Sequence, residues 1–216
     1  FVSMVSHEIR SPMNSVLMQL KVLLDGLAGP VSEKQNSILT RASERIKALV
    51  ALSSELLDLA RIESGLITQE KEKVDLGAML AEQAEFHRPK AEAKGQIIEL
   101  PPLPQLPPII DNRQNMDEVM SNLITNAINY TPQGGRISLG ADVEDNFIRI
   151  KVADNGLGIA KEDQEKIFNR FYRVTNEKTR LITGTGLGLP IVKRIVEAHK
   201  GKVLLESEVD QGTTFH

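Results

Sequence analysis

The chain has 216 residues, of which 41% are hydrophobic and 25% charged, a composition typical of globular proteins. Its net charge is −3 and no segment forms a basic stripe, so the sequence predicts no nucleic-acid binding. The absence of cysteine excludes disulfides and thiolate metal sites, and no apolar run approaches the roughly 20 residues that cross a bilayer.

The two ends of the sequence indicate a fragment. The chain begins at Phe1 and stops at His216, within a predicted strand. We therefore expect a core excised from a longer protein, with any sensor segment upstream and absent from this chain. We expect the fragment to be cytoplasmic and without direct membrane contact. The sequence leaves open whether the full-length protein carries a membrane anchor.

Two long helices are predicted in the first third of the chain. Seam positions spaced alternately by three and four residues lie along one face of the first helix. They are Val2, Ser6, Ile9, Met13, Val16, Leu20, Leu23 and Leu27. Gly26 and Gly29-Pro30 are expected to end this helix.

The second helix has its own start signal and its own seam. Ser32 and Gln35 have the spacing of a capping box, and apolar residues recur from Leu39 to Leu59 before an expected end near Gly65. An isolated hairpin cannot bury both seams. We therefore expect two hairpins to pair through residues 1–70 into a homodimeric four-helix bundle.

His7 is a candidate nucleophile on the first helix. It follows the seam position Ser6 and is expected to face away from the bundle core, where a solvated surface histidine is the alternative interpretation. Ser11 lies four residues on, on the same face, and Pro12 has no N–H for the carbonyl of Glu8, which predicts a bend. A neutral imidazole can attack phosphorus, and Glu8 is placed to orient the ring or to take its proton.

The rest of the chain is predicted to be α+β. The expected elements are helices at 76–94, 115–130, 161–171 and 189–199, and strands at 97–100, 136–141, 147–153, 202–206 and 213–215, with a turn at 145–146. Residues 101–108 are rich in proline and are expected to be extended, like polyproline. A rigid surface connector is the simpler interpretation of this segment, and a peptide ligand for a proline-binding module is the alternative.

Three stretches in this part have the chemistry of a nucleotide site. Asn122 and Asn126 lie four residues apart on one helical face, where amide oxygens suit Mg²⁺ held by phosphates, although caps or surface polar residues are an alternative. Asp154 follows a strand and precedes Gly156 and Gly158. Its carboxylate can accept from an amine such as that of adenine, with an ordinary Asx turn as the alternative.

The third stretch, Gly184-Thr185-Gly186-Leu187-Gly188, leads into a helix whose N-terminal amides favour phosphate oxygens. It lacks the Lys-Ser/Thr ending of a P-loop and does not directly follow a strand as a Rossmann loop does. Each stretch alone is a weak signal. Their order behind His7 predicts a phosphate acceptor and an ATP site in one chain.

With these features the chain resembles the catalytic core of sensor histidine kinases of two-component systems, over essentially all of its length. The matching segments are Phe1–Pro12 (H box), Asn122–Thr131 (N box), Asp154–Ile159 (G1 box), Phe168–Phe171 (F box), Gly184–Leu189 (G2 box) and Gly212–Phe215, the last glycine motif. The resemblance implies a dimerisation and phosphotransfer hairpin at residues 1–70. It implies an α/β two-layer sandwich of the Bergerat type at 71–216, shared with Hsp90, gyrase B and MutL.

The resemblance also implies roles for single residues, with ATP and Mg²⁺ as cofactors. His7 would be the phospho-acceptor and Glu8 its acid/base partner. Asn126 would be a Mg²⁺ ligand beside Asn122, and Arg170 would contact the transferring phosphate. The nucleoside would be bound by Tyr130, by Asp154 as the adenine ligand and by Gly156 and Gly158 in the base pocket, and Gly184 to Gly188 would form the phosphate loop. Residues 174–183 would form a mobile lid, with Lys178 and Arg180 as candidate phosphate contacts.

Two departures from the family pattern bear on activity. Asn129 stands where the N box usually has a basic residue, which predicts a lost phosphate contact and puts ATP affinity in question. Ser11 stands where Thr or Asn is common, and its hydroxyl is compatible with phosphatase activity toward the partner.

The main hypothesis is an ATP-dependent protein-histidine kinase that passes phosphate from His7 to an aspartate of a response-regulator receiver domain. One alternative is a related ATPase, although Asn122 stands where such enzymes have a water-activating glutamate. The other alternative is a nucleotide-binding signalling scaffold without catalysis.

Overall fold

The computed structural model describes residues 2–63, 71–145, 147–180, 182 and 184–216. The chain divides into two compact units, Phe1–Ser64 and Gly65–His216, and each is described by itself. The domain boundary predicted at residue 70 falls in 64–70, outside the described residues, and stays a prediction. Within the described part of the chain, no helix is both long and apolar enough to span a membrane.

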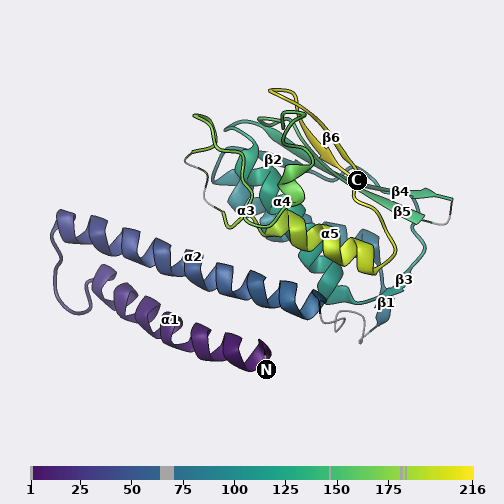
Figure 1. The fold of residues 1–216 in the computed structure, drawn as a ribbon. Helices are drawn as coiled ribbons and strands as arrows, with labels where there is room; N and C mark the ends of the chain where they lie inside the picture. The colour runs from purple at the N-terminus through teal and green to yellow at the C-terminus, as the bar shows by residue number, and fades with distance from the viewer. Residues whose placement is uncertain (1, 64–70, 146, 181, 183) are drawn as a thin grey trace. The chain divides into compact units, whose positions relative to one another are not determined.

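The first unit is a helical hairpin of α1 (Val2–Leu24) and α2 (Glu33–Glu63), drawn from purple to blue in Figure 1. Pro12 lies inside α1, and the bend expected beside it stays a prediction. The predicted capping box at the start of α2 is confirmed. The backbone N–H of Ser32 donates to Oε1 of Gln35 at 2.8 Å, and the N–H of Gln35 donates to Oγ of Ser32 at 3.3 Å.

Glycine ends α1 as the sequence predicts. Gly26 has a φ of +74°, and its N–H donates to the carbonyl of Leu23 at 3.1 Å. The N–H of Leu27 donates to the carbonyl of Val22 at 3.0 Å, which completes a left-handed helix end that glycine adopts readily. Leu27, the last predicted seam position, lies beyond α1 and is 76% exposed.

The second unit is built on a five-stranded sheet in the order β2-β4-β5-β7-β6. The strands are β2 (Ile97–Glu99), β4 (Arg136–Glu144), β5 (Phe147–Asp154), β6 (Leu205–Glu208) and β7 (Gly212–Phe215). Only the β2–β4 pair is parallel among these described strands. Helices α3 (Leu76–Glu92), α4 (Arg113–Tyr130) and α5 (Gly188–Ala198) form a layer against the sheet (Figure 1).

The core lies between that helical layer and the sheet. Its fully buried large side chains include Met79 and Leu80 of α3, Met120, Ile124 and Ile128 of α4, Ile137 and Leu139 of β4, and Ile191 and Ile195 of α5. Burying each such side chain contributes about 1.5–3 kcal/mol relative to leaving it exposed. The core therefore fixes α4 and the ends of β5 and β7, which carry the candidate site.

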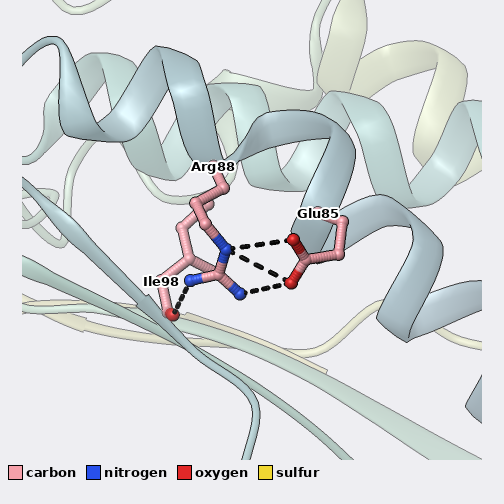
Figure 2. Close-up of polar contacts among 3 residues, drawn as sticks. All are labelled: Glu85, Arg88 and Ile98. Carbon is pink, nitrogen blue, oxygen red and sulfur yellow. Dashed lines mark hydrogen bonds and ion pairs between the residues drawn. The ribbon is translucent and has the colours of Figure 1, made fainter.

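An arginine connects the first helix of this layer to the edge strand β2. Figure 2 shows Arg88 of α3 donating from Nη1 to the carbonyl of Ile98 at 3.4 Å and from Nη2 to Oε1 of Glu85 at 2.7 Å. The hydrogen bond and the charge of Arg88 lower the pKa of the exposed Glu85 carboxyl. A cationic side chain at an edge strand also disfavours pairing with a foreign strand.

Two short strands were not predicted, and one predicted strand begins later than expected. A small antiparallel pair of β1 (Glu72–Val74) and β3 (Ile109–Asp111) was not predicted, because strands of three residues are too short to show a period. The strand expected at 202–206 begins instead at Leu205. The turn predicted at 145–146 contains Asp145 with a φ of +51°, whereas Asn146 lies outside the described residues.

The helix predicted at 161–171 is also wrong. Turns and a short 3-10 helix at Lys166–Phe168 occupy this stretch. Nε2 of Gln164 donates to the carbonyls of Ile159 and Ser207, at 3.0 and 2.9 Å, and the ring of Phe168 packs edge-on against Phe215. These contacts with the sheet override the local helical pattern.

Candidate functional site

Helix α4 carries the first group of predicted site residues. Asn122, Asn126 and Tyr130 are spaced by four on one face of this helix, and all three are half-buried. Nδ2 of Asn122 donates to the carbonyl of Glu118 at 3.0 Å. Its Oδ1 would lie only 2.8 Å from a Cβ added to Gly188, so the amide oxygen faces the start of α5.

The loop after β5 docks on the C-terminal end of α4. The N–H of Leu157 donates to the carbonyl of Tyr130 at 3.1 Å. A Cβ added to Gly156 would lie 2.5 Å from that same carbonyl oxygen and 2.6 Å from Oδ1 of Asp154. Gly156 therefore permits an approach that any side chain would block, and this approach brings the predicted N-box and G1-box residues together.

Asp154 is the last residue of β5 and pairs in register with Thr213 of β7. The N–H of Gly156 donates to its Oδ1 at 2.8 Å, and the backbone of Thr213 supplies a second hydrogen bond. Burial nevertheless raises the pKa of the Asp154 carboxyl to about 6, because desolvation outweighs both bonds. A ligand amine would add a donor that this carboxylate can use.

Gly158 holds the other side of this loop against the β6–β7 hairpin. It has a φ of +64°, and an added Cβ would lie 1.9 Å from the carbonyl oxygen of Glu208. The N–H of Asp210 also donates to the carbonyl of Leu157 at 2.8 Å. The loop is thus fixed between α4 and the β6–β7 turn.

The predicted phosphate loop, 184–188, lies against the segment that contains Arg170. The N–H of Phe171 donates to the carbonyl of Gly186 at 3.0 Å. Gly186 has a φ of +75°, and an added Cβ would lie 2.8 Å from the backbone carbon of Phe171. The exposed Arg170 is therefore the immediate chain neighbour of a residue bonded to this loop.

Helix α5 starts at Gly188 with no acidic residue in its first turn, so its N-terminal amides keep a positive field. Oγ1 of Thr185 accepts from the N–H of Leu187 at 3.3 Å, and Leu187 is fully buried. These contacts explain the two non-glycine residues of the loop, because Thr185 stabilises its turn and the buried Leu187 anchors it. The loop and helix start suit an anion.

The two candidate phosphate contacts of the predicted lid, Lys178 and Arg180, are both exposed. Nζ of Lys178 lies 2.6 Å from Oδ1 of Asp210, and both side chains are exposed, so in this structure Lys178 is paired with the β6–β7 turn. Arg180 is exposed, and the backbone here is folded by Asn176, whose Oδ1 accepts from the N–H groups of Lys178 and Thr179. Residues 181 and 183 of the predicted lid lie outside the described residues.

Two residues near the site were missed from sequence. Thr213 is predicted from sequence to lie in a strand and in a glycine motif but not in the site, yet its backbone bonds Asp154 and its Oγ1 lies 2.9 Å from Oγ of Ser207. Arg173 donates to the carbonyl of Ile182, and its Nε would lie 3.9 Å from a Cβ on Gly184. Neither residue type nor spacing identifies them, because the contacts depend on the fold.

His7, Glu8 and Ser11 belong to the other unit, on α1. Glu8 and Ser11 are exposed, whereas the side chain of His7 lies outside the described residues, so its predicted outward orientation stays a prediction. Arg10 links α1 to α2 by donating from Nη2 to Oγ of Ser54 at 3.0 Å. The described side chains next to residue 7, those of Glu8, Arg10 and Ser11, are thus polar and exposed.

The residues of the second unit fit an adenine nucleotide. A half-buried acid, glycines that admit no side chain, and an uncapped helix start match a base and its phosphates. No group of three or more His, Cys, Asp or Glu residues in the described part of the chain could hold a metal ion. The residues present fit a Mg²⁺ that would be held by phosphate oxygens and by the amide oxygen of Asn126.

Comparisons with known proteins agree with this site. Residues 1–65 match the family described as the His Kinase A (phospho-acceptor) domain. Residues 111–216 match the family described as histidine kinase-, DNA gyrase B- and HSP90-like ATPases. The first match covers the first unit, and the second match lies within the second unit, from residue 111 onward.

Curated relatives match over the whole chain. Sensor histidine kinase WalK of Bacillus subtilis is 33% identical over 217 residues, which are 100% of this chain and 35% of WalK. Drug sensory protein A of Synechocystis is 34% identical over 225 residues, covering 100% of this chain and 34% of that protein. The chain spans about a third of the length of these relatives.

Solved structures are similar as well. Full-length ShkA in complex with AMPPNP superposes with a TM-score of 0.79 at 30% identity, covering 99% of this chain and 44% of ShkA. Histidine kinase AdeS of Acinetobacter baumannii gives a TM-score of 0.66 at 25% identity, covering 97% of this chain and 94% of the AdeS chain.

Proposed function

The chain belongs to the sensor histidine kinase family, and on that premise we propose that it is the catalytic core of an ATP-dependent protein-histidine kinase. It phosphorylates His7 and then passes the phosphoryl group to an aspartate of a response-regulator receiver domain. The observation that carries this proposal is the convergence of Asp154, the end of α4 and the glycine loop 184–188 in one chain with the α1 histidine.

ATP is held by the second unit in this proposal. Asp154 accepts from the adenine amine, and the loop of Gly156 and Gly158 forms the floor of the base pocket. The amides at the start of α5 bind phosphate oxygens, with Arg170 near the transferring group. Asn126 would hold Mg²⁺ through its amide oxygen, with Asn122 beside it, and that ion would neutralise phosphate charge.

The transfer reaction uses residues of α1. The neutral nitrogen of His7 donates its lone pair to the γ-phosphorus while the bond from that phosphorus to the bridging oxygen of ADP breaks, and the electron pair leaves with ADP. The ring then loses its proton, for which the exposed Glu8 is the adjacent acceptor on the helix. In the second step the receiver aspartate attacks phosphorus and the imidazole leaves.

Two partners follow from this proposal. A second copy of the chain covers the apolar faces of the hairpin. In one copy the exposed large hydrophobic side chains of the hairpin are Val16, Met18, Val22, Leu27, Ile38, Leu49 and Leu56. The receiver domain contacts the hairpin around His7. The hydroxyl of Ser11 is placed one helical turn from His7 and supports phosphatase activity toward that receiver.

The test is incubation of the chain with γ-labelled ATP and Mg²⁺, beside His7→Ala and, as a matched control, His216→Ala. The intact chain and the control should gain label that is acid-labile and base-stable, and His7→Ala should gain none. Steady phosphate release that ignores His7→Ala would identify an ATPase instead. Nucleotide binding without any label would identify a non-catalytic scaffold.

A further inference from the structure

The proline-rich connection between β2 and β3 has a regular pattern of burial. Residues 101–108 form no helix or strand, and six of the eight are exposed. The half-buried positions are Leu100, Leu103, Leu106 and Ile109, which recur every three residues. A polyproline II helix has three residues per turn, so these four side chains lie along one edge of such a helix.

The two leucines within the segment share one anchor. A Cβ added to Gly77, in the first turn of α3, would lie 3.9 Å from Cδ1 of Leu103 and 3.9 Å from Cδ1 of Leu106. Two side chains three residues apart therefore converge on the same point of the second unit. This contact holds one edge of the segment against the protein and turns the other two edges outward.

The outward edges consist almost entirely of proline. Pro101, Pro104 and Pro107 lie along one edge, and Pro102, Gln105 and Pro108 along the other, and all six are exposed. Proline fixes its own φ near −65° and biases the preceding residue toward extended conformations. Gln105 is the single position of 101–108 that neither is a proline nor precedes one. The positive φ angles among the described residues all lie outside this segment.

We propose that the outward edges of residues 101–108 form a docking ridge for a partner protein that binds polyproline II segments in an aromatic-lined groove. Grooves of this kind receive two edges of a three-sided helix and leave the third edge free. In this chain the third edge is already occupied by Leu103 and Leu106 against Gly77. Because the segment is stiff and anchored before it binds, docking costs little conformational entropy.

The C-terminal end of the segment leads to the end of α4 that is farther from Asn126. Residues 101–108 precede β3 and the N-cap of α4 at Asn112, whereas Asn126 lies roughly 20 Å further along the helix axis at 1.5 Å per residue. A partner on the ridge should therefore leave nucleotide binding unchanged. The inference is independent of the phosphotransfer proposed for His7.

The test uses the whole 216-residue chain and two probes, a WW domain and an SH3 domain. Both carry groove tryptophans, and this chain has no tryptophan, so any fluorescence change reports on the probe alone. We expect a saturable change with at least one probe. Pro104 is shared by both Pro-x-x-Pro pairs of its edge, so Pro104→Ala should weaken binding about tenfold or more, equivalent to about 1.4 kcal/mol.

Pro30→Ala is the matched control, since Pro30 is an exposed proline in the hairpin turn, and it should bind like the intact chain. A peptide of residues 97–111 should displace the chain from the probe, which keeps the test valid if Pro104→Ala folds poorly. No saturable change up to about 1 mM with either probe would overturn the proposal, as this excludes even weak complexes. Equal binding by Pro104→Ala, or failure of the peptide to compete, would also overturn it.

Discussion

The hairpin and the α/β unit bury their apolar residues to very different degrees. Among the described residues, the fully buried hydrophobic side chains all lie at or beyond Val74, and the buried residue of the hairpin is Ser43, at 8% exposure. Leu27 and Met18 are 76% and 72% exposed. The α/β unit closes its own core, whereas the hairpin leaves apolar side chains exposed, which we propose are covered by a second copy.

The two units should therefore differ in how strongly their stability depends on association. In the proposed function, the nucleotide-binding residues lie on elements fixed by a closed core. The helix that carries His7 lies on a hairpin whose stability would depend on association. We therefore expect changes in the α/β core to act at any protein concentration. Changes on the hairpin faces should act through the monomer–dimer equilibrium.

The largest effect should come from a cavity in the α/β core. Ile124→Ala removes a fully buried side chain of α4 and should destabilise this unit by about 2–5 kcal/mol. Urea unfolding would measure this loss of stability, and nucleotide binding by the same variant would be measured afterwards. Ile110→Ala, at a 65% exposed position, is the control and should have little effect. Equal effects of the two variants would contradict the assigned core.

A charge on the apolar face of α2 should separate the two copies. Leu49 is 49% exposed in a single hairpin, and Leu49→Asp would place a carboxylate in the dimer contact. Sedimentation should show a dimer for the intact chain and a monomer for the variant, with nucleotide affinity unchanged. Lys47→Asp, at an exposed position of the same helix, is the control. A monomeric intact chain would refute the proposal that a second copy covers this face.

Removing the cap of α2 should have a smaller effect. Ser32→Ala loses the hydroxyl that accepts from the N–H of Gln35, which should cost about 1 kcal/mol of hairpin stability. The hairpin transition in thermal unfolding should shift down while the α/β transition stays in place. Ser37→Ala, within the helix, is the control. A shift in both transitions would contradict the independence of the two units.

The smallest predicted effect is a pH dependence of nucleotide binding. The pKa of Asp154 is raised to about 6 from 3.8, so the ionised carboxylate that accepts from adenine is present above pH 6 and is lost as the pH falls through it. Affinity for ADP should therefore fall about fourfold from pH 7.5 to 5.5. Asp154→Asn measured at each pH corrects for titration of ADP itself. The same fall in that variant would exclude Asp154 as the cause.

Long periodic elements were predictable from sequence, and short or tertiary ones were not. The capping box at Ser32 and Gln35 and the glycine stop at Gly26 act locally, so residue type and spacing suffice. By contrast, the 161–171 stretch has helical composition but is held in turns by Gln164 and Phe168 against distant strands. The β1–β3 pair was missed because three residues show no period.

The candidate site, like the fold, was predictable from sequence only where its residues carry a local signal. The order of Asn122, Asp154 and the glycines of 184–188 predicted that these residues belong to one nucleotide site. In the second unit, the loop after Asp154 and the start of α5 both lie against α4, through a hydrogen bond to Tyr130 and a close approach of Gly188 to Asn122. The reason for each glycine, such as the carbonyl of Tyr130 behind Gly156, depends on how α4 packs. The contacts of Thr213 and Arg173 arise the same way, so no local signal marks them.

The central claim is that phosphate from ATP arrives on the imidazole of His7. The most direct measurement is mass-spectrometric mapping of the modified residue after incubation with ATP and Mg²⁺, under neutral conditions that preserve a phosphorus–nitrogen bond. The account predicts one phosphorylated residue, His7, in the peptide that spans the start of α1. Phosphate on Ser6 or Ser11 instead, or on a histidine of the α/β unit, would contradict it.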